Sequence, residues 1–60
     1  MTKKDYELIA LQISKQLTYQ KASPAICAGI KTVARELGEA FANENPRFDY
    51  DKFIQACGME

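Results

Sequence analysis

The stretch SPAICAGIKTVARELGEAFAN, residues 23–43, decides the fold of this chain. Ser23 is a favourable N-cap residue, and Pro24 suits the first helical position, where the amide it lacks would have no helical partner. Apolar residues then recur every three or four positions, which is the repeat of one face of a helix. We therefore expect a long helix over 24–43, packed through one face and charged on the other. The apolar face comprises Ile26, Ile30, Val33, Ala34, Leu37 and Phe41, and the charged residues opposite are Lys31, Arg35 and Glu39.

A second amphipathic helix precedes this stretch and is expected over about 3–18. Thr2 and Asp5 have the spacing of a capping box, and Asp5 places negative charge near the positive end of the helix dipole. Only a short polar link separates the two helices, which favours an antiparallel arrangement. The face of this helix expected to pack consists of Tyr6, Ile9, Ala10, Ile13 and Leu17.

A third, short helix is expected over about 50–57, after a turn at Asn45–Pro46. Asp49 fits the N-cap position, and Phe48 and Phe53 have the spacing of a hydrophobic staple across it. Gly58 suits the position after the last turn. So short a helix is not stable alone, and it must dock on the other two.

Together these patterns predict one all-α domain over residues 1–60, with two antiparallel helices and a short C-terminal helix closing over them. Two glycines, Gly29 and Gly38, interrupt the long helix, and close approach of a neighbouring helix, a bend near Gly38 and a functional hinge remain open explanations. The expected core is Tyr6, Ile9, Ile13, Leu17, Ile26, Ile30, Val33, Leu37, Phe41, Phe48, Phe53 and Ile54.

Composition argues against several classes of function. Eight acidic and eight basic side chains give a formal net charge of zero, which does not favour a nucleic-acid partner. No apolar run resembles a signal peptide or a membrane span, so we expect a cytosolic protein that does not bind membranes. In that setting Cys27 and Cys57 are expected to be reduced and packed; a disulfide between them and a metal site are the alternatives.

The sequence offers little catalytic chemistry. It contains no histidine and no glycine-rich phosphate-binding motif. Asp49 and Asp51 are explained by helix capping and by the helix dipole rather than by acid–base catalysis. We therefore expect a non-enzymatic protein with no catalytic residue, cofactor or bound metal.

Protein binding is the function that the pattern favours. Leu8 and Leu11 do not lie on the packing face of the first helix and fall beside Lys15. Either they are ordinary exposed leucines or covered by the third segment, or they form a second apolar face that binds another copy of the chain or a different protein. A second candidate surface is formed by Arg47 and Tyr50, residue types favoured in interfaces, although Arg47 could instead cap the carbonyls that end the long helix.

A helix-turn-helix DNA-binding regulator is the alternative. The long helix, a turn and the short helix occur in the required order, but the link is longer than the usual tight turn. The short helix also offers an acidic residue, Asp51, beside a single cation, Lys52, where phosphates would bind.

Both ends of the chain resemble a group of short bacteriophage and prophage proteins. The resemblance rests on Lys3–Ala10, on Glu44–Asp49, on Phe53 and on Ala56–Gly58, and it leaves most of the middle unmatched. It implies a phage or mobile-element setting inside a bacterial cell, where a small accessory protein would modulate a host or phage protein. It transfers no catalytic or binding residue to this chain.

Overall fold

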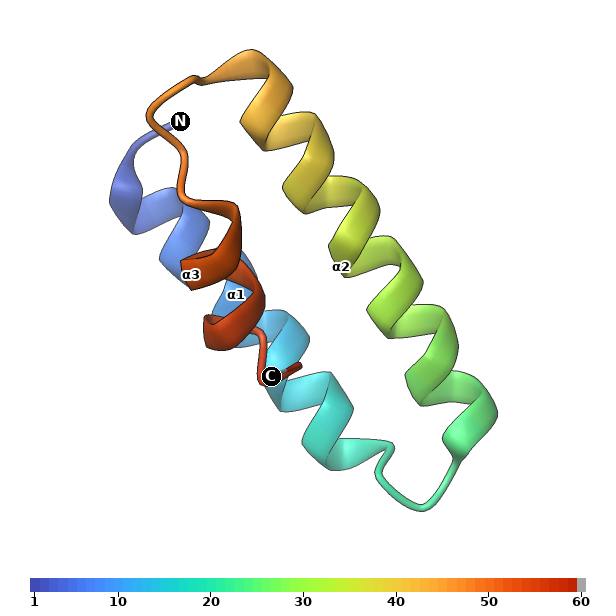
Figure 1. Cartoon of the computed structure of the whole chain (residues 1–60). Coiled ribbons are helices and arrows are strands. Elements are labelled where there is room, and N and C mark those ends of the chain that lie inside the picture. Colours follow the sequence, from blue (N-terminus) through green and yellow to red (C-terminus); the bar gives the residue numbers. More distant parts are fainter. Residues whose placement is uncertain (60) are drawn as a thin grey trace.

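The computed structural model describes residues 1–59 and contains three helices in that range, α1 (Lys3–Tyr19), α2 (Pro24–Glu44) and α3 (Tyr50–Ala56). As Figure 1 shows, α1 and α2 run antiparallel as a long hairpin, and α3 folds back over one side of it. The predicted all-α class is confirmed. Each predicted helix is present, and the predicted ends lie within one residue of the observed ones.

Local hydrogen bonds fix the ends of α1 and α3. At the start of α1, the Thr2 amide donates to Asp5 Oδ2 at 2.9 Å, and the Asp5 amide donates to Thr2 Oγ1 at 3.4 Å, so the capping box is confirmed. At the start of α3, the Lys52 amide donates to Asp49 Oδ1 at 3.0 Å. Gly58 follows α3 with a φ of 82°, a left-handed conformation that glycine adopts without a steric penalty.

The start of α2 differs from the expected cap. Ser23 occupies the N-cap position, but its side chain makes no capping hydrogen bond. Its backbone amide instead donates to the Gln20 carbonyl at 2.8 Å, inside the turn that leaves α1. The helix therefore begins here because of the turn and of Pro24 at its first position, without help from the serine hydroxyl.

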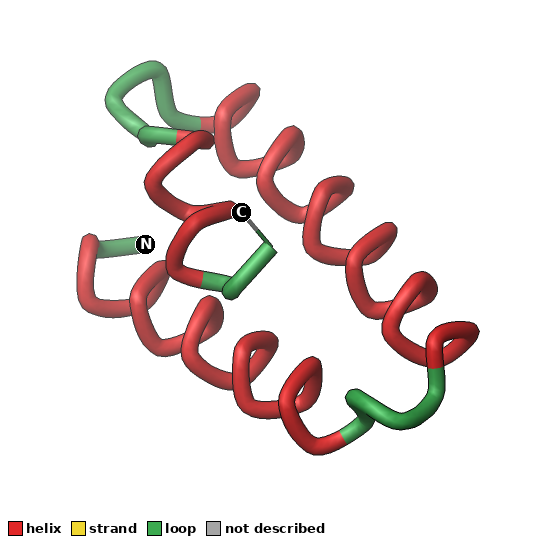
Figure 2. The backbone as a smooth tube through the Cα atoms, turned by 60° about the horizontal axis from the view of Figure 1, so that its bottom comes forward, coloured by secondary structure: helices red, strands yellow, loops and turns green. Residues whose placement is uncertain are grey.

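The hairpin and α3 meet over a small core. Ala10 on α1 and Ala34 on α2 are buried, and Phe53 and Cys57 from the C-terminal segment are buried against them. Small side chains at the first two positions let the helices approach closely, and α3 packs against both long helices, beside which it lies in Figure 2. Gly38 is explained by the close approach of α3 to α2, because a Cβ added at this position would lie 2.7 Å from Tyr50 Cε2.

Four aromatic rings close one end of the molecule, where α1 begins, α2 ends and α3 begins. Tyr6 lies 4.6 Å from Phe48 and 5.0 Å from Phe41 between ring centroids, and Phe48 lies 5.5 Å from Phe53. The last of these pairs is the predicted hydrophobic staple. Contacts in this range between tilted or edge-on rings stabilise a fold beyond the burial of their area.

The prediction that Ile26 and Val33 belong to the core is wrong. Ile26 and Val33 lie on the surface, with 49% and 58% of their area exposed. The packed face of α2 is centred on Ala34 and Gly38, which are both buried, rather than on the larger aliphatic residues. Lys31, expected on the charged face, is half-buried as a result. The other members of the predicted core are buried or half-buried: Tyr6, Ile9, Ile13, Leu17, Ile30, Leu37, Phe41, Phe48, Phe53 and Ile54.

No helix within residues 1–59 combines the length and the hydropathy that a bilayer span requires.

Candidate functional site

The outer surface of α1 carries the first group of predicted interaction residues. Lys4, Leu8, Leu11 and Lys15 are spaced by four, three and four positions, so they form one stripe along the helix, which we call the leucine ridge. All four are exposed, and Leu8 and Leu11 expose 58% and 52% of their area. The third segment does not cover them. The ridge therefore offers two adjacent leucines between two cations.

The two residues of the second candidate surface, Arg47 and Tyr50, have different environments in the fold. Tyr50 is half-buried, and its ring lies against the backbone of α2 at Gly38, so it acts mainly in packing. Arg47 is exposed, and its backbone amide donates to Asn45 Oδ1 at 3.0 Å in the turn before α3. It lines a hollow of about 540 Å³ between the start of α1 and α3, together with residues of both charges such as Lys3, Glu7, Asp49 and Lys52. Neither Leu8, Leu11 nor Lys15 lines this hollow.

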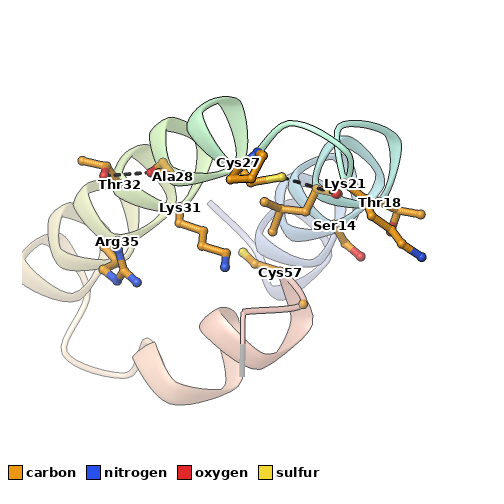
Figure 3. A pocket seen from close by; sticks show the side chains of 12 residues that line it. Ser14, Thr18, Lys21, Cys27, Ala28, Lys31, Thr32, Arg35 and Cys57 are labelled. Atoms are coloured by element: carbon orange, nitrogen blue, oxygen red, sulfur yellow. Dashed lines mark hydrogen bonds between the residues drawn. The ribbon is translucent and has the colours of Figure 1, made fainter.

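A cleft at the other end of the hairpin was not predicted. Because α3 has only seven residues, it covers only part of the groove between α1 and α2. The uncovered part is a cleft of about 650 Å³, shown in Figure 3, which we call the basic cleft. Lys21, Lys31 and Arg35 line it, and none of its lining residues within 1–59 is acidic. The remaining lining residues are Ser14, Leu17, Thr18, Pro24, Cys27, Ala28, Thr32, Cys57 and Gly58.

The cations of this cleft were visible in the sequence, but their position was not. Lys31 and Arg35 are four residues apart and therefore project from the same side of α2. The periodicity of the sequence predicted that this side faces solvent, because it lies opposite the larger aliphatic residues. The shift of the packed face toward Ala34 and Gly38 brings Lys31 to the edge of the groove instead.

The two cysteines are free thiols with different environments. Cys27 Sγ lies 3.2 Å from the Gln20 carbonyl oxygen, an interaction that links the start of α2 to the turn after α1. Cys57 is fully buried, and burial raises the pKa of its thiol because the thiolate would lose its hydration. A neutral, buried thiol is a packing group rather than a nucleophile.

The side chains that line the cleft are suited to binding a ligand. Among the described residues that line it, the polar side chains are three cations, the hydroxyls of serine and threonine and two thiols, and none of them is a carboxylate or an imidazole. Within residues 1–59, no three potential metal ligands lie close enough together to hold an ion.

The chain matches no protein family, and neither a curated protein nor a solved structure is significantly similar to it.

Proposed function

We propose that this chain is a non-enzymatic interaction domain that binds another protein through the leucine ridge. The observation that carries the proposal is the exposure of Leu8 and Leu11, side by side on α1 and left uncovered by α2 and α3. Large adjacent apolar side chains on a surface, rimmed by polar groups, are characteristic of interaction sites. Lys4 and Lys15 at the two ends of the ridge favour a partner with an apolar groove between carboxylates.

The biological setting is also a proposal. We infer that the protein is a phage- or prophage-type accessory protein in the bacterial cytoplasm, where it modulates a host or phage protein. The resemblance of Lys3–Ala10 and Glu44–Asp49 to short phage proteins supports this setting.

A DNA-binding regulator is the second candidate function, and the basic cleft is the observation that favours it. Lys21, Lys31 and Arg35 line one cavity in which the other lining residues within 1–59 are uncharged, an arrangement that suits a phosphate backbone. Against it, the surface of α3 exposes Asp51 beside Lys52, and a link of five residues separates α3 from α2.

The test is a pull-down from bacterial lysate with immobilised wild-type protein and with the Leu8→Glu, Leu11→Glu double variant. The matched control is Tyr19→Glu, which places a charge on another exposed apolar residue, one with 84% of its area exposed. We expect a protein that stays bound in raised salt to the wild type and to the control, and that the double variant loses while it remains helical. Equal capture by the folded double variant would refute the proposal. Retention of duplex DNA that decreases steeply with salt would support the alternative.

A further inference from the structure

The basic cleft is a groove whose length follows from the residues that line it. On α2 these residues recur every three or four positions from Pro24 to Arg35, so they form one stripe along the helix. The helical steps between these two residues rise about 16 Å. Spread over that length, the 650 Å³ of the cleft corresponds to a cross-section of about 40 Å².

This cross-section selects among the possible occupants of the groove. One extended peptide chain takes up about 48 Å², given a spacing of about 4.8 Å between strands and about 10 Å between sheets. A helix is about 10–12 Å across with its side chains and needs roughly twice that area. The groove therefore accepts one extended chain, with one side left open to solvent, and about five residues span its length.

The charge of the groove is local and positive. The chain as a whole has a formal net charge of zero, but three of its eight basic side chains line this groove. The other lining residues within 1–59 are uncharged. A concentration of one sign of charge in a cleft favours an occupant of the opposite sign.

The positions of the cations match the side-chain repeat of an extended chain. Lys31 and Arg35 project from the same side of α2 in Figure 3, and four helical residues separate them by about 6 Å along the axis. On an extended chain, side chains two positions apart lie on the same face and are about 6.6 Å apart. Two acidic residues at alternate positions would therefore meet Lys31 and Arg35. A further acidic residue would meet Lys21, in the turn after α1.

Uncharged side chains between the cations suit a peptide backbone. Ser14, Thr18 and Thr32 line the groove with hydroxyls. The Thr32 hydroxyl donates to the Ala28 carbonyl at 3.0 Å, which leaves its oxygen able to accept a hydrogen bond from a peptide amide. Leu17 and Ala28 add apolar contacts along the same groove.

Nucleic acid fits this groove less well than a peptide does. A duplex is a convex cylinder about as wide as the 18 × 16 Å cross-section of the whole chain, so its phosphates would reach only the rim. Single strands bind through aromatic side chains on which their bases stack. None of the described residues that line the groove is aromatic.

We propose that the basic cleft binds an extended acidic segment of another protein, in which acidic side chains occupy alternate positions. None of the four residues of the leucine ridge lines the cleft, so the two surfaces are separate. The acidic segment is therefore a second ligand, and a domain with both sites can hold two proteins together.

Fluorescence anisotropy with labelled synthetic peptides tests the proposal. The probe is a heptapeptide with glutamate at every second position and alanine elsewhere. The matched probe contains the same three glutamates, placed so that no two of them are two positions apart. We expect the alternating peptide to bind the wild type several-fold more tightly than the matched probe, because only alternation gives the spacing of Lys31 and Arg35.

Charge-removing variants locate the site. The Lys31→Gln, Arg35→Gln double variant should bind the alternating peptide about tenfold more weakly. The control is Lys4→Gln, Lys15→Gln, which removes two exposed cations outside the cleft and should leave the affinity within about twofold. Circular dichroism shows whether each variant is folded. If the double variant is not, Lys21→Gln, at an exposed turn position, should weaken binding about threefold.

Several results would overturn the proposal. They are no binding of the alternating peptide to the wild type, equal affinity for the two peptides, and an equal loss in the cleft and control variants. So would a labelled oligonucleotide that displaces the peptide, binds more tightly and is lost in the same double variant, a result that assigns the cleft to DNA. The leucine ridge is tested separately by the pull-down, so failure of one site does not imply failure of the other.

Discussion

The two internal glycines of α2 predict opposite effects for the same substitution. Glycine in a helix interior is less favourable than alanine by about 1 kcal/mol, so each Gly→Ala change gains that amount from the helix itself. At Gly29 an added Cβ meets nothing within 4 Å. Gly29→Ala should therefore raise the free energy of unfolding by about 1 kcal/mol.

Gly38→Ala should lower the free energy of unfolding, because its Cβ would lie 2.7 Å from Tyr50 Cε2 and 2.9 Å from Tyr50 Cδ2. The ring and the start of α3 must then move. Overpacking of this kind costs about 1–3 kcal/mol, which leaves a net loss of up to about 2 kcal/mol after the helix gain. For a domain of this size, 1 kcal/mol corresponds to about 4–8 °C in the melting temperature.

Urea denaturation followed by circular dichroism measures both variants, at one protein concentration because self-association changes apparent stability. The same Gly38→Ala change in a Tyr50→Ala background should become stabilising, since the clashing ring is gone. This double-mutant comparison isolates the contact from the helix propensity. If Gly38→Ala stabilises the wild-type protein as much as Gly29→Ala does, the assigned approach of α3 to α2 is wrong.

Three further predictions follow from the core, the buried thiol and the capping box. Phe53→Ala should cost about 3–5 kcal/mol, comparable to the whole stability of so small a domain, and loss of the cooperative thermal transition would show it; a transition like that of the wild type would show that the core is misplaced. Burial raises the pKa of the Cys57 thiol above its ordinary 9.0, so its contribution to stability is complete at lower pH and is lost as the pH rises through the folded pKa. Urea unfolding of wild type and Cys57→Ala across alkaline pH should show a steeper loss for the wild type, and parallel curves would contradict the assignment. Hydrogen bonds from the backbone amide and the hydroxyl of Thr2 hold the pKa of the Asp5 carboxyl below its ordinary 3.8, so its contribution is present above that value and is lost as the pH falls through the folded pKa. An acid titration of helix content should show this loss in wild type and not in Asp5→Asn, whereas identical titrations would exclude a role for the capping box.

Local signals in the sequence determined the secondary structure. Thr2 with Asp5, Pro24, Asp49 and Gly58 act on backbone groups within a few residues of themselves, so their effects can be predicted without the tertiary fold. The staple between Phe48 and Phe53 is equally local. These signals explain why all three helices were predicted with nearly correct ends.

The sequence placed Leu8 and Leu11 off the packing face of α1 but left open whether the third segment covers them, and the structure shows both exposed. Both residues lie far around α1 from its packing face, which helical periodicity gives without the tertiary fold. For the same reason, the stripe of the leucine ridge could be described from helical spacing alone.

Only the tertiary structure decided which face of α2 packs. Hydrophobicity favoured the larger aliphatic residues, but α3 must approach the hairpin closely, and Ala34 and Gly38 permit this while Val33 does not. That choice turns Ile26 and Val33 toward solvent and brings Lys31 to the edge of the basic cleft. Periodicity shows which residues share a side of a helix, but the side that is buried depends on the shape of what packs against it.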